Sequence, residues 1–290
     1  MPAALFICNS RSPEFAAALI ALGEAFDVKT HEGVAAACGP LCQGTQDEAC
    51  CGVELIVLAQ SRPGEFTAAE VDRLRRRFPS AAVISLLGSW SEGETRSGKP
   101  LATACRLYWH QAADRLRRDI ARRASGQSPL WSLPTTSTED ERVLRSAAAP
   151  PRQRTGKECT DDKRSSRATV ALFGHDRSSI AWLVDACRAG GYEPVWMGPR
   201  CAVEPCDVVA AIWDLTAWTS ASADELRQIT RFVPAHRVVA LLGFPRWHDI
   251  QRAARQGLGA IISKPLVLDD LYSAINRFVE PATESATAKR

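Results

Sequence analysis

An aspartate and a lysine each stand at the end of a short apolar run, where they could form a charged pair. Asp214 ends the run "VVAAIWD", and Lys264 follows "AIIS" directly before Pro265, in the stretch "GLGAIISKPLVLDD". The two residues are 50 positions apart (264 minus 214). If both runs are parallel strands of one sheet, their carboxyl ends meet at the edge where functional groups of such sheets gather. We therefore expect the Lys264 ammonium to approach the Asp214 carboxylate from an adjacent strand.

Three further side chains belong to the same predicted edge. His175 and Asp176 follow the apolar run "TVALFG", and Leu242 ends the run "VVALL". A hard cation needs several oxygen ligands, and Asp176 with Asp214 supplies few of them. The alternative for the lysine is a solvated strand end without a contact to the aspartate.

Short apolar runs alternate with helical patterns along most of the chain. The runs show no polar alternation, which is typical of parallel strands covered on both faces. Helical spacing of apolar residues predicts helices over residues 13–25, 67–78, 111–123, 178–191, 222–232, 248–257 and 267–278. Alternating strands and helices predict the α/β class, with two doubly wound parallel sheets.

The two halves of the chain resemble one another, which indicates an internal repeat. "AALFICN" near the start matches "VALFGHD" from residue 170, and "AAVISLLGSW" from residue 81 matches "HRVVALLGFPRW" from residue 236. Residues 125–166 are rich in Ser, Thr, Pro and charge and poor in aliphatic side chains, a composition typical of a linker. We predict a domain over residues 1–124, a flexible linker over 125–166, a domain over 167–280 and a disordered tail over 281–290.

Residues 167–280 resemble a response-regulator receiver domain. The resemblance rests on "AARQGLGAIISKPLVLDDL", which is similar to the Ala…Gly-Ala…Lys-Pro signature before the last helix of that family, and on the spacing of Asp214 and Lys264. It implies a flavodoxin-like, receiver-type fold and a histidine kinase that phosphorylates Asp214. It also implies that Lys264 pairs with the phosphoryl group, that two acidic residues hold Mg²⁺, and that a Ser or Thr contacts the phosphoryl oxygens.

The match is incomplete at the positions that carry this chemistry. The acidic pair falls on Gly174 and His175, which leaves Asp176 as the nearest carboxylate, and the Ser or Thr position falls on Leu242. Phosphoryl transfer needs the charge on the transferred group to be neutralised, and leucine cannot donate a hydrogen bond to it. We therefore interpret this domain as a degenerate receiver without a cofactor, in which Mg²⁺ binds only if Asp214 is a working phosphoacceptor.

Residues 1–124 form a more remote receiver-like repeat. Its third strand, "VELIVLAQSRPG", places Ala59 or Ser61 at the acceptor position, and neither is a carboxylate. The fifth strand is predicted in "CRLYWHQ", with His110 near the lysine position. This domain is expected to lack the phosphoacceptor.

A glycine-rich loop, "GSWSEGETRSGKP", runs from Gly88 to Pro100. Its backbone amides, together with Arg96 and Lys99, could hold an anion or a carboxylate of a partner. Alternatively, the loop is a long turn that Trp90 pins in place and in which the glutamates pair with Arg96. The candidate residues of this loop are Trp90, Glu92, Glu94, Arg96 and Lys99.

A second cluster, "CGPLCQGTQDEACC", offers four thiols with His31 upstream. Thiolates and imidazole bind zinc, but adjacent cysteines seldom both ligate one tetrahedral ion and no Cys-x2-Cys pair is present. The cluster is a weak metal site, and reduced loop cysteines are the alternative. Its members are Cys38, Cys42, Cys50 and Cys51.

The overall composition, 46% hydrophobic and 24% charged, favours a soluble globular protein. The formal net charge of +3 argues against binding to nucleic acid or to membranes, and no apolar run is long enough to span a bilayer. The start of the chain, "MPAALFICNS", reads as a buried first strand of a cytoplasmic protein. The resemblance to receiver domains implies a role in protein–protein interaction within a two-component pathway, with unidentified partners, and we expect no enzyme activity. Two alternatives stay open: a response regulator phosphorylated at Asp214, and a sensor that binds a small molecule or anion at the glycine-rich loop.

Overall fold

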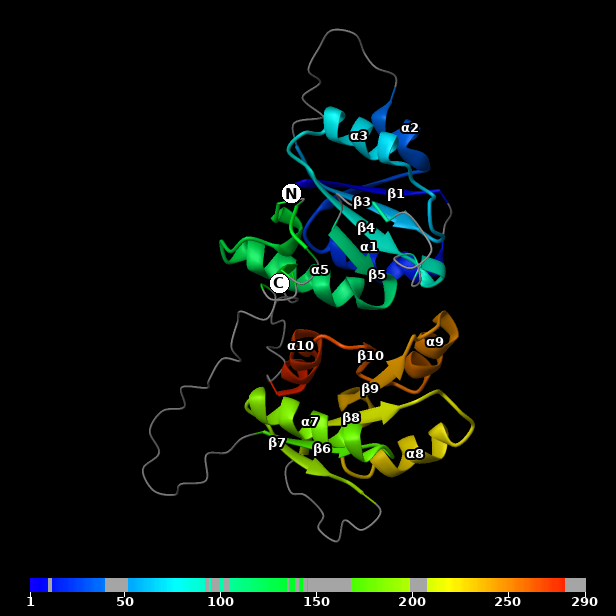
Figure 1. Ribbon diagram of the computed structural model, residues 1–290, viewed down its shortest axis with the longest axis vertical. Helices are drawn as coiled ribbons and strands as arrows, with labels where there is room; N and C mark the ends of the chain where they lie inside the picture. Colours follow the sequence, from blue (N-terminus) through cyan, green and yellow to red (C-terminus); the bar gives the residue numbers. More distant parts are fainter. Residues whose placement is uncertain are drawn as a thin grey trace, which may run out of the picture. The chain divides into compact units, whose positions relative to one another are not determined.

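The computed structural model of the chain describes residues 1–9, 12–39, 52–91, 94, 100–101, 105–134, 136–138, 141–142, 145, 168–198 and 208–279. The chain divides into two compact units, Met1–Ser146 and Ala147–Arg290, and each contains one five-stranded sheet (Figure 1). Within the described ranges, no helix combines the length and the apolar character needed to cross a membrane.

In the first unit the strand order is β2-β1-β3-β4-β5, and every strand pair is parallel. The elements in chain order are β1 (Ala3–Cys8), η1 (Pro13–Phe15), α1 (Ala16–Gly23), β2 (Asp27–His31), α2 (Gly33–Cys38), β3 (Val53–Gln60), α3 (Ala68–Arg77), β4 (Ala82–Leu87), η3 (Ser89–Ser91), β5 (Cys105–Tyr108), α5 (Trp109–Ala124) and η4 (Leu130–Ser132).

In the second unit the order is β10-β9-β8-β6-β7, again with parallel pairing throughout. The elements are β6 (Thr169–Phe173), α7 (Arg177–Ala189), β7 (Glu193–Trp196), β8 (Val208–Leu215), α8 (Ser222–Ile229), η5 (Ala235–Arg237), β9 (Val238–Gly243), α9 (Trp247–Arg255), β10 (Ala260–Lys264) and α10 (Leu268–Val279).

Both sheets have the same topology when their strands are numbered within each unit. The order is 2-1-3-4-5, which defines the flavodoxin-like doubly wound class. The predicted fold class is therefore confirmed. In such sheets the carboxyl ends of the strands gather at one edge, and that edge is where a functional site is sought.

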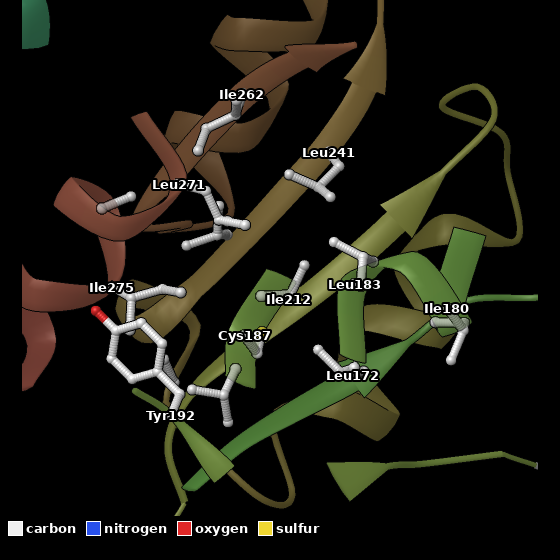
Figure 2. Close-up of a cluster of buried hydrophobic side chains, with 14 residues drawn as sticks. Leu172, Ile180, Leu183, Cys187, Tyr192, Ile212, Leu241, Ile262, Leu271 and Ile275 are labelled. Carbon is white, nitrogen blue, oxygen red and sulfur yellow. The ribbon is translucent and has the colours of Figure 1, made fainter. Parts of the chain in front are cut away.

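Apolar side chains on both faces explain why the strands read as continuous hydrophobic runs. In the second unit, one face of the sheet packs on α7 and α10, with Leu183 and Leu271 among the buried residues (Figure 2). The other face packs on α8 through Leu226 and Ile229. In the first unit, α2 and α3 cover one face of the sheet.

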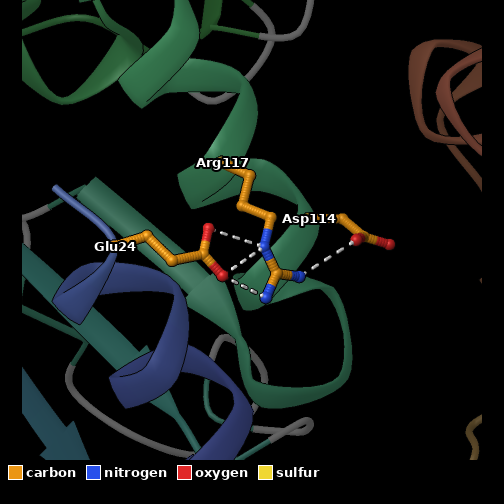
Figure 3. A network of polar contacts seen from close by, with 3 residues as sticks. All are labelled: Glu24, Asp114 and Arg117. Carbon is orange, nitrogen blue, oxygen red and sulfur yellow. Dashed lines mark hydrogen bonds and ion pairs between the residues drawn. The ribbon is translucent and has the colours of Figure 1, made fainter. Parts of the chain in front are cut away.

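The other helices of the first unit, α1 and α5, are joined at the surface by charged side chains. Arg117 donates to Glu24 over 2.8 to 3.1 Å, and a weaker contact of 3.9 Å links Arg117 to Asp114 (Figure 3). The hydrogen bond from Arg117 lowers the pKa of the Glu24 carboxyl, and the same bond raises the pKa of Arg117. Because these side chains are largely exposed, the pair contributes at most about 1 kcal/mol.

The structure differs from the sequence-based predictions at three places in the first unit. The short helix α2 was not predicted. His110 lies in the first turn of α5 and not in the fifth strand. Trp131 is buried against Phe26, with ring centroids 6.3 Å apart, so packing of this unit continues past residue 124 into the predicted linker.

Candidate functional site

The carboxyl ends of β6, β8, β9 and β10 form one edge of the second sheet. Asp214 of β8 is in register with Leu241 of β9, and Gly243 of β9 is in register with Lys264 of β10. β9 therefore lies between the strand that carries Asp214 and the strand that carries Lys264. The expectation that these two strands are adjacent is wrong, because the sheet order inserts β9 between them.

The lysine side chain is long enough to reach across β9. Lys264 Nζ donates a hydrogen bond to Asp214 Oδ1 over 2.7 Å. The Asp214 side chain is 8% exposed and the Lys264 side chain is 33% exposed, so water reaches the ammonium group more easily than the carboxylate. The predicted contact is confirmed, and Lys264 is not a solvated strand end.

Gly174 lies at the end of β6, at the first position of the predicted acidic pair. A Cβ atom here would lie 3.1 Å from Asp214 Cβ and 3.1 Å from Ile180 Cδ1. Both distances are shorter than ordinary van der Waals contact, so any larger residue would displace its neighbours. The close approach of this backbone to Asp214 explains the glycine, because a larger residue would require Asp214 or Ile180 to shift.

Asp176 is present at the same edge, but its carboxylate caps helix α7. Its two oxygens accept hydrogen bonds from the backbone N–H groups of Ser178 and Ser179, over 3.3 and 2.8 Å, and from the Ser179 hydroxyl, over 2.6 Å. These bonds, the Ser179 side chain first, lower the pKa of Asp176, and the charge of Lys264 acts in the same direction. Asp176 therefore serves the helix terminus, as Asp commonly does at an N-cap.

His175 points into solvent and contacts a glutamate that sequence reasoning missed. Its Nε2 lies 3.4 Å from Glu225 Oε1, and the other oxygen of Glu225 accepts a hydrogen bond from Trp213 Nε1 over 3.1 Å. Glu225 on α8 thus links the loop after β6 to the buried indole beside Asp214. In the sequence, Glu225 falls on the solvated face of a predicted helix, and no local signal marks it as part of a site.

Leu242 packs in the hydrophobic core. It belongs to a buried cluster with Trp213 and Leu215, on the sheet face that α8 covers. Side chains alternate along a strand, so Asp214, which stands between Trp213 and Leu215, points to the opposite face. Leu242 is therefore directed away from the aspartate as well as lacking a hydroxyl.

The first unit repeats the strand register of the second. The offset between β3 and β4 is 27 residues (82 minus 55), as it is between β8 and β9 (241 minus 214). When Gly88 after β4 is matched to Gly243 of β9, Ala59 takes the position of Asp214. Ser61 lies two residues further on and is not the equivalent residue.

The lysine position of the first unit holds a tryptophan. β4 and β5 are offset by 21 residues (105 minus 84), as are β9 and β10 (264 minus 243). This offset places Trp109, which is buried, opposite Gly88 and therefore in the place of Lys264. His110, predicted near this position, is the next residue and lies in the first turn of α5.

In the first unit, a glutamate carboxylate binds the residue that follows Gly88 at the carboxyl end of β4. Glu14, on η1, accepts hydrogen bonds from the backbone N–H and the hydroxyl of Ser89, over 3.0 and 2.6 Å. A Cβ at Gly88 would lie 2.9 Å from Glu14 Oε2, so a larger residue would displace this carboxylate. The two partners are 75 residues apart, and the sequence carries no signal for their contact.

The glycine-rich loop is described only in part. Trp90 is 75% exposed, so it does not pin the loop. Glu94 is 1% exposed and accepts a hydrogen bond from Arg106 Nη2 of β5 over 3.0 Å, which is a structural role for this residue. Glu92, Arg96 and Lys99 lie outside the described residues. The charged Arg106 in the strand "CRLY" was the sequence signal for a buried partner.

The cysteine cluster is likewise seen at one end only. Cys38 ends α2 and packs in the core of the first unit, where burial raises the pKa of its thiol. Cys42, Cys50 and Cys51 lie outside the described residues. Among the residues that are described, no group of three or more His, Cys, Asp or Glu side chains could hold a metal ion.

Comparison with known proteins gives matches among solved structures only. No protein-family model matches the chain, and no curated protein sequence matches it significantly. Among solved structures, the C-terminal part of E. coli RcsC, which contains a linker region and a phosphoreceiver domain, matches with 14% identity and a TM-score of 0.31. The match covers 96% of this chain and 92% of that one.

Two further solved structures match at a similar level. An acetyl-coenzyme A synthetase from Ca. Korarchaeum cryptofilum shares 14% identity at a TM-score of 0.29, with 96% of this chain and 65% of that chain covered. The protein PH0766 from Pyrococcus horikoshii shares 13% identity at a TM-score of 0.30, with 94% and 64% covered. This chain therefore spans slightly less than two thirds of the length of either protein.

Proposed function

We propose that this is a regulatory protein whose two receiver-type units act through contacts with other proteins, in a two-component-type pathway, and not as enzymes. The observation that carries the proposal is that Asp176, the carboxylate nearest to the contact of Lys264 Nζ with Asp214 Oδ1, is engaged in capping α7 through Ser178 and Ser179. Gly174 lies against Asp214 and Leu242 points to the opposite face of the sheet, so the two positions that would bind Mg²⁺ and the phosphoryl oxygens carry no suitable group. Phosphoryl transfer depends on such groups for positioning and charge neutralisation.

A second candidate function is phosphorylation of Asp214 itself. It is supported by the same lysine contact and by Asp176, which lies within electrostatic reach of Lys264. In this case Asp214 and Asp176 would be the oxygen ligands available to a divalent cation. A phosphorylated Asp214 would then exchange its contact with Lys264 for one between Lys264 and the phosphoryl group.

The two candidates differ in their response to a phosphoryl analogue. The melting temperature of the full chain is measured in Mg²⁺ with and without beryllofluoride, which mimics an aspartyl phosphate. Under the first proposal the melting temperature does not change on addition, because the edge of the sheet offers too few ligands for the complex. In parallel, treatment with acetyl phosphate should give no hydroxylamine-sensitive label.

The matched control is Asp214→Asn, which removes the acceptor and keeps the size of the side chain. A stabilisation by beryllofluoride that disappears in this variant would replace the first proposal by the second. A hydroxylamine-sensitive label from acetyl phosphate on residues 1–124 would contradict the register that places Ala59 at the acceptor position.

A further inference from the structure

A line of polar side chains crosses three strands of the first sheet. Gln60 of β3 donates from Nε2 to Ser85 Oγ of β4 over 2.8 Å. Ser85 is the register partner of Arg106 on β5, and Arg106 Nη2 donates to Glu94 Oε2 over 3.0 Å. Gln60, Ser85 and Glu94 are each 1% exposed. We call these four residues the polar line.

The polar line lies on the sheet face that α2 and α3 cover. Leu58 of β3 and Val83 of β4 belong to the apolar cluster on this face. Gln60 and Ser85 each follow two residues later, and side chains two residues apart on a strand point to the same face. Arg106 faces the same way because it pairs in register with Ser85. A hydrophobic core therefore surrounds these polar groups.

The same positions in the second unit are apolar. The register that matches Ala59 to Asp214 also assigns counterparts to the three strand residues of the polar line. In chain order the counterparts are Leu215, Ala240 and Ile261, which pack in the cluster on the α8 face. Because the two sheets share one register, this fold can fill all three positions with apolar side chains. The architecture alone therefore does not explain the polar line.

Two hydrogen-bonding atoms of the polar line have no partner among the described residues. They are Gln60 Oε1, which accepts hydrogen bonds, and Arg106 Nε, which donates one. Ser91 Oγ, three residues before Glu94, is a further atom of this kind, in a side chain that is 0% exposed. An unpaired buried polar atom destabilises a fold, and an apolar core would avoid that cost. The polar line thus offers an acceptor and a donor to a further group.

The charge of the polar line is balanced, and its outer end is open to water. Glu94 neutralises the Arg106 guanidinium, so the pair favours neither an anion nor a cation. Arg106 stands on the edge strand β5 with an 18% exposed side chain, whereas Gln60 is 1% exposed. A molecule that enters beside Arg106 and reaches Gln60 must therefore be small, neutral and polar.

We propose that the polar line is a binding site for a small neutral molecule of the amide class. The N–H group of the molecule donates to Gln60 Oε1, and its carbonyl oxygen accepts from Arg106 Nε. An amide carries this donor and this acceptor on neighbouring atoms, which suits two groups that flank Ser85. The inference goes beyond the proposed function, because it assigns a ligand to the first unit.

The test uses the full chain and γ-butyrolactam, a cyclic amide with adjacent N–H and C=O groups, in a titration followed by saturation-transfer NMR. N-methyl-γ-butyrolactam, which lacks the N–H group, and acetate, which is charged, are the matched probes. We expect a millimolar dissociation constant for γ-butyrolactam, because a molecule of this size makes few contacts. Both matched probes should bind at least about tenfold more weakly.

Variants of the polar line change the site and keep the fold. Gln60→Leu combined with Ser85→Ala introduces the residues of the second unit, so it should weaken lactam binding at least about tenfold. It should melt no lower than the parent, because it removes an unpaired buried acceptor. Arg106→Lys keeps a cation for Glu94 and lacks Nε, so it should weaken binding about tenfold.

Gln256→Leu is the matched control for the glutamine change. Gln256 Oε1, in the second unit, is also a buried atom without a partner among the described residues. This variant should bind γ-butyrolactam as the parent does. Equal loss of binding in Gln256→Leu would show that the lactam does not select the polar line, and would overturn the inference.

The inference is also overturned if γ-butyrolactam does not bind, which would assign ordered water to the polar line. Equal binding of the N-methyl form or of acetate would overturn it, as would unchanged lactam binding in the variants of the polar line. The outcome is independent of the proposed function, so Asp214→Asn should bind the lactam as the parent does. Loss of lactam binding in Asp214→Asn would place the site in the second unit and contradict the inference.

Discussion

Asp214 and Lys264 are unequal partners, because water reaches one of them and hardly reaches the other. If Lys264 is removed, a carboxylate with an 8% exposed side chain loses its hydrogen-bond donor. If Asp214 is changed to Asn, the ammonium group of a 33% exposed lysine can turn to solvent. The loss of a partner is more costly for a buried group than for an exposed one.

We therefore predict that Lys264→Ala destabilises the protein more than Asp214→Asn does. The lysine variant should cost about 1–3 kcal/mol and the aspartate variant about 0–2 kcal/mol. Chemical denaturation of the full chain measures both changes in the free energy of unfolding. In the double variant no carboxylate is left unpaired, so its cost should be smaller than the sum of the two single costs. Additive costs would show that the 2.7 Å contact contributes nothing in solution.

At the scale of elements, the strands and long helices could be predicted because each has a strong local pattern. Helix α2, with the sequence "GVAAAC", could not, since six residues of small side chains show no clear period. The contact of Lys264 with Asp214 was predictable from spacing, whereas its path across β9 depends on the sheet order. The pairs Glu14–Ser89 and Glu225–Trp213 arise from tertiary packing and leave no mark on the local sequence.

The start of α7 gives a pH-dependent prediction. The hydrogen bonds from Ser178 and Ser179 lower the pKa of Asp176 in the folded state, so ionised Asp176 stabilises the fold above its unfolded value of 3.8. This contribution is lost as pH falls through the folded pKa. Asp176→Asn keeps a capping oxygen but does not titrate, and it lacks the charge that favours a helix N-terminus.

The melting temperature of the parent should therefore exceed that of Asp176→Asn at neutral pH, and the difference should shrink below about pH 4. Asp185→Asn removes one negative charge from the middle of the same helix and serves as the control. A difference between the parent and Asp176→Asn that stays constant down to pH 2 would mean that the carboxylate does not act as the cap.

At the scale of the whole molecule, each unit has its own sheet and its own buried clusters, and the strand offsets repeat between them. The extent of the first unit depends on a segment beyond α5. Trp131 on η4 is buried against Phe26, and the Asp119 carboxylate of α5 accepts a hydrogen bond from the backbone of Leu130. Arg142, further along, is also buried. The composition of residues 125–166, rich in Ser, Thr and Pro, suggested a linker. The one tryptophan that anchors the segment carries little weight in an average over its composition.

Limited proteolysis tests where the first unit ends. Trypsin should cut first among the basic residues of 147–166, a segment with the composition of a linker, and spare Arg142, whose burial protects it. The resistant N-terminal fragment should therefore contain Trp131 when its mass is measured. Trp131→Ala removes a buried ring, so it should cost about 3 kcal/mol and make Arg142 a cleavage site. Early cleavage at Arg142 in the parent would instead place the boundary near residue 124, and equal protection in Trp131→Ala would show that the tryptophan does not hold the segment.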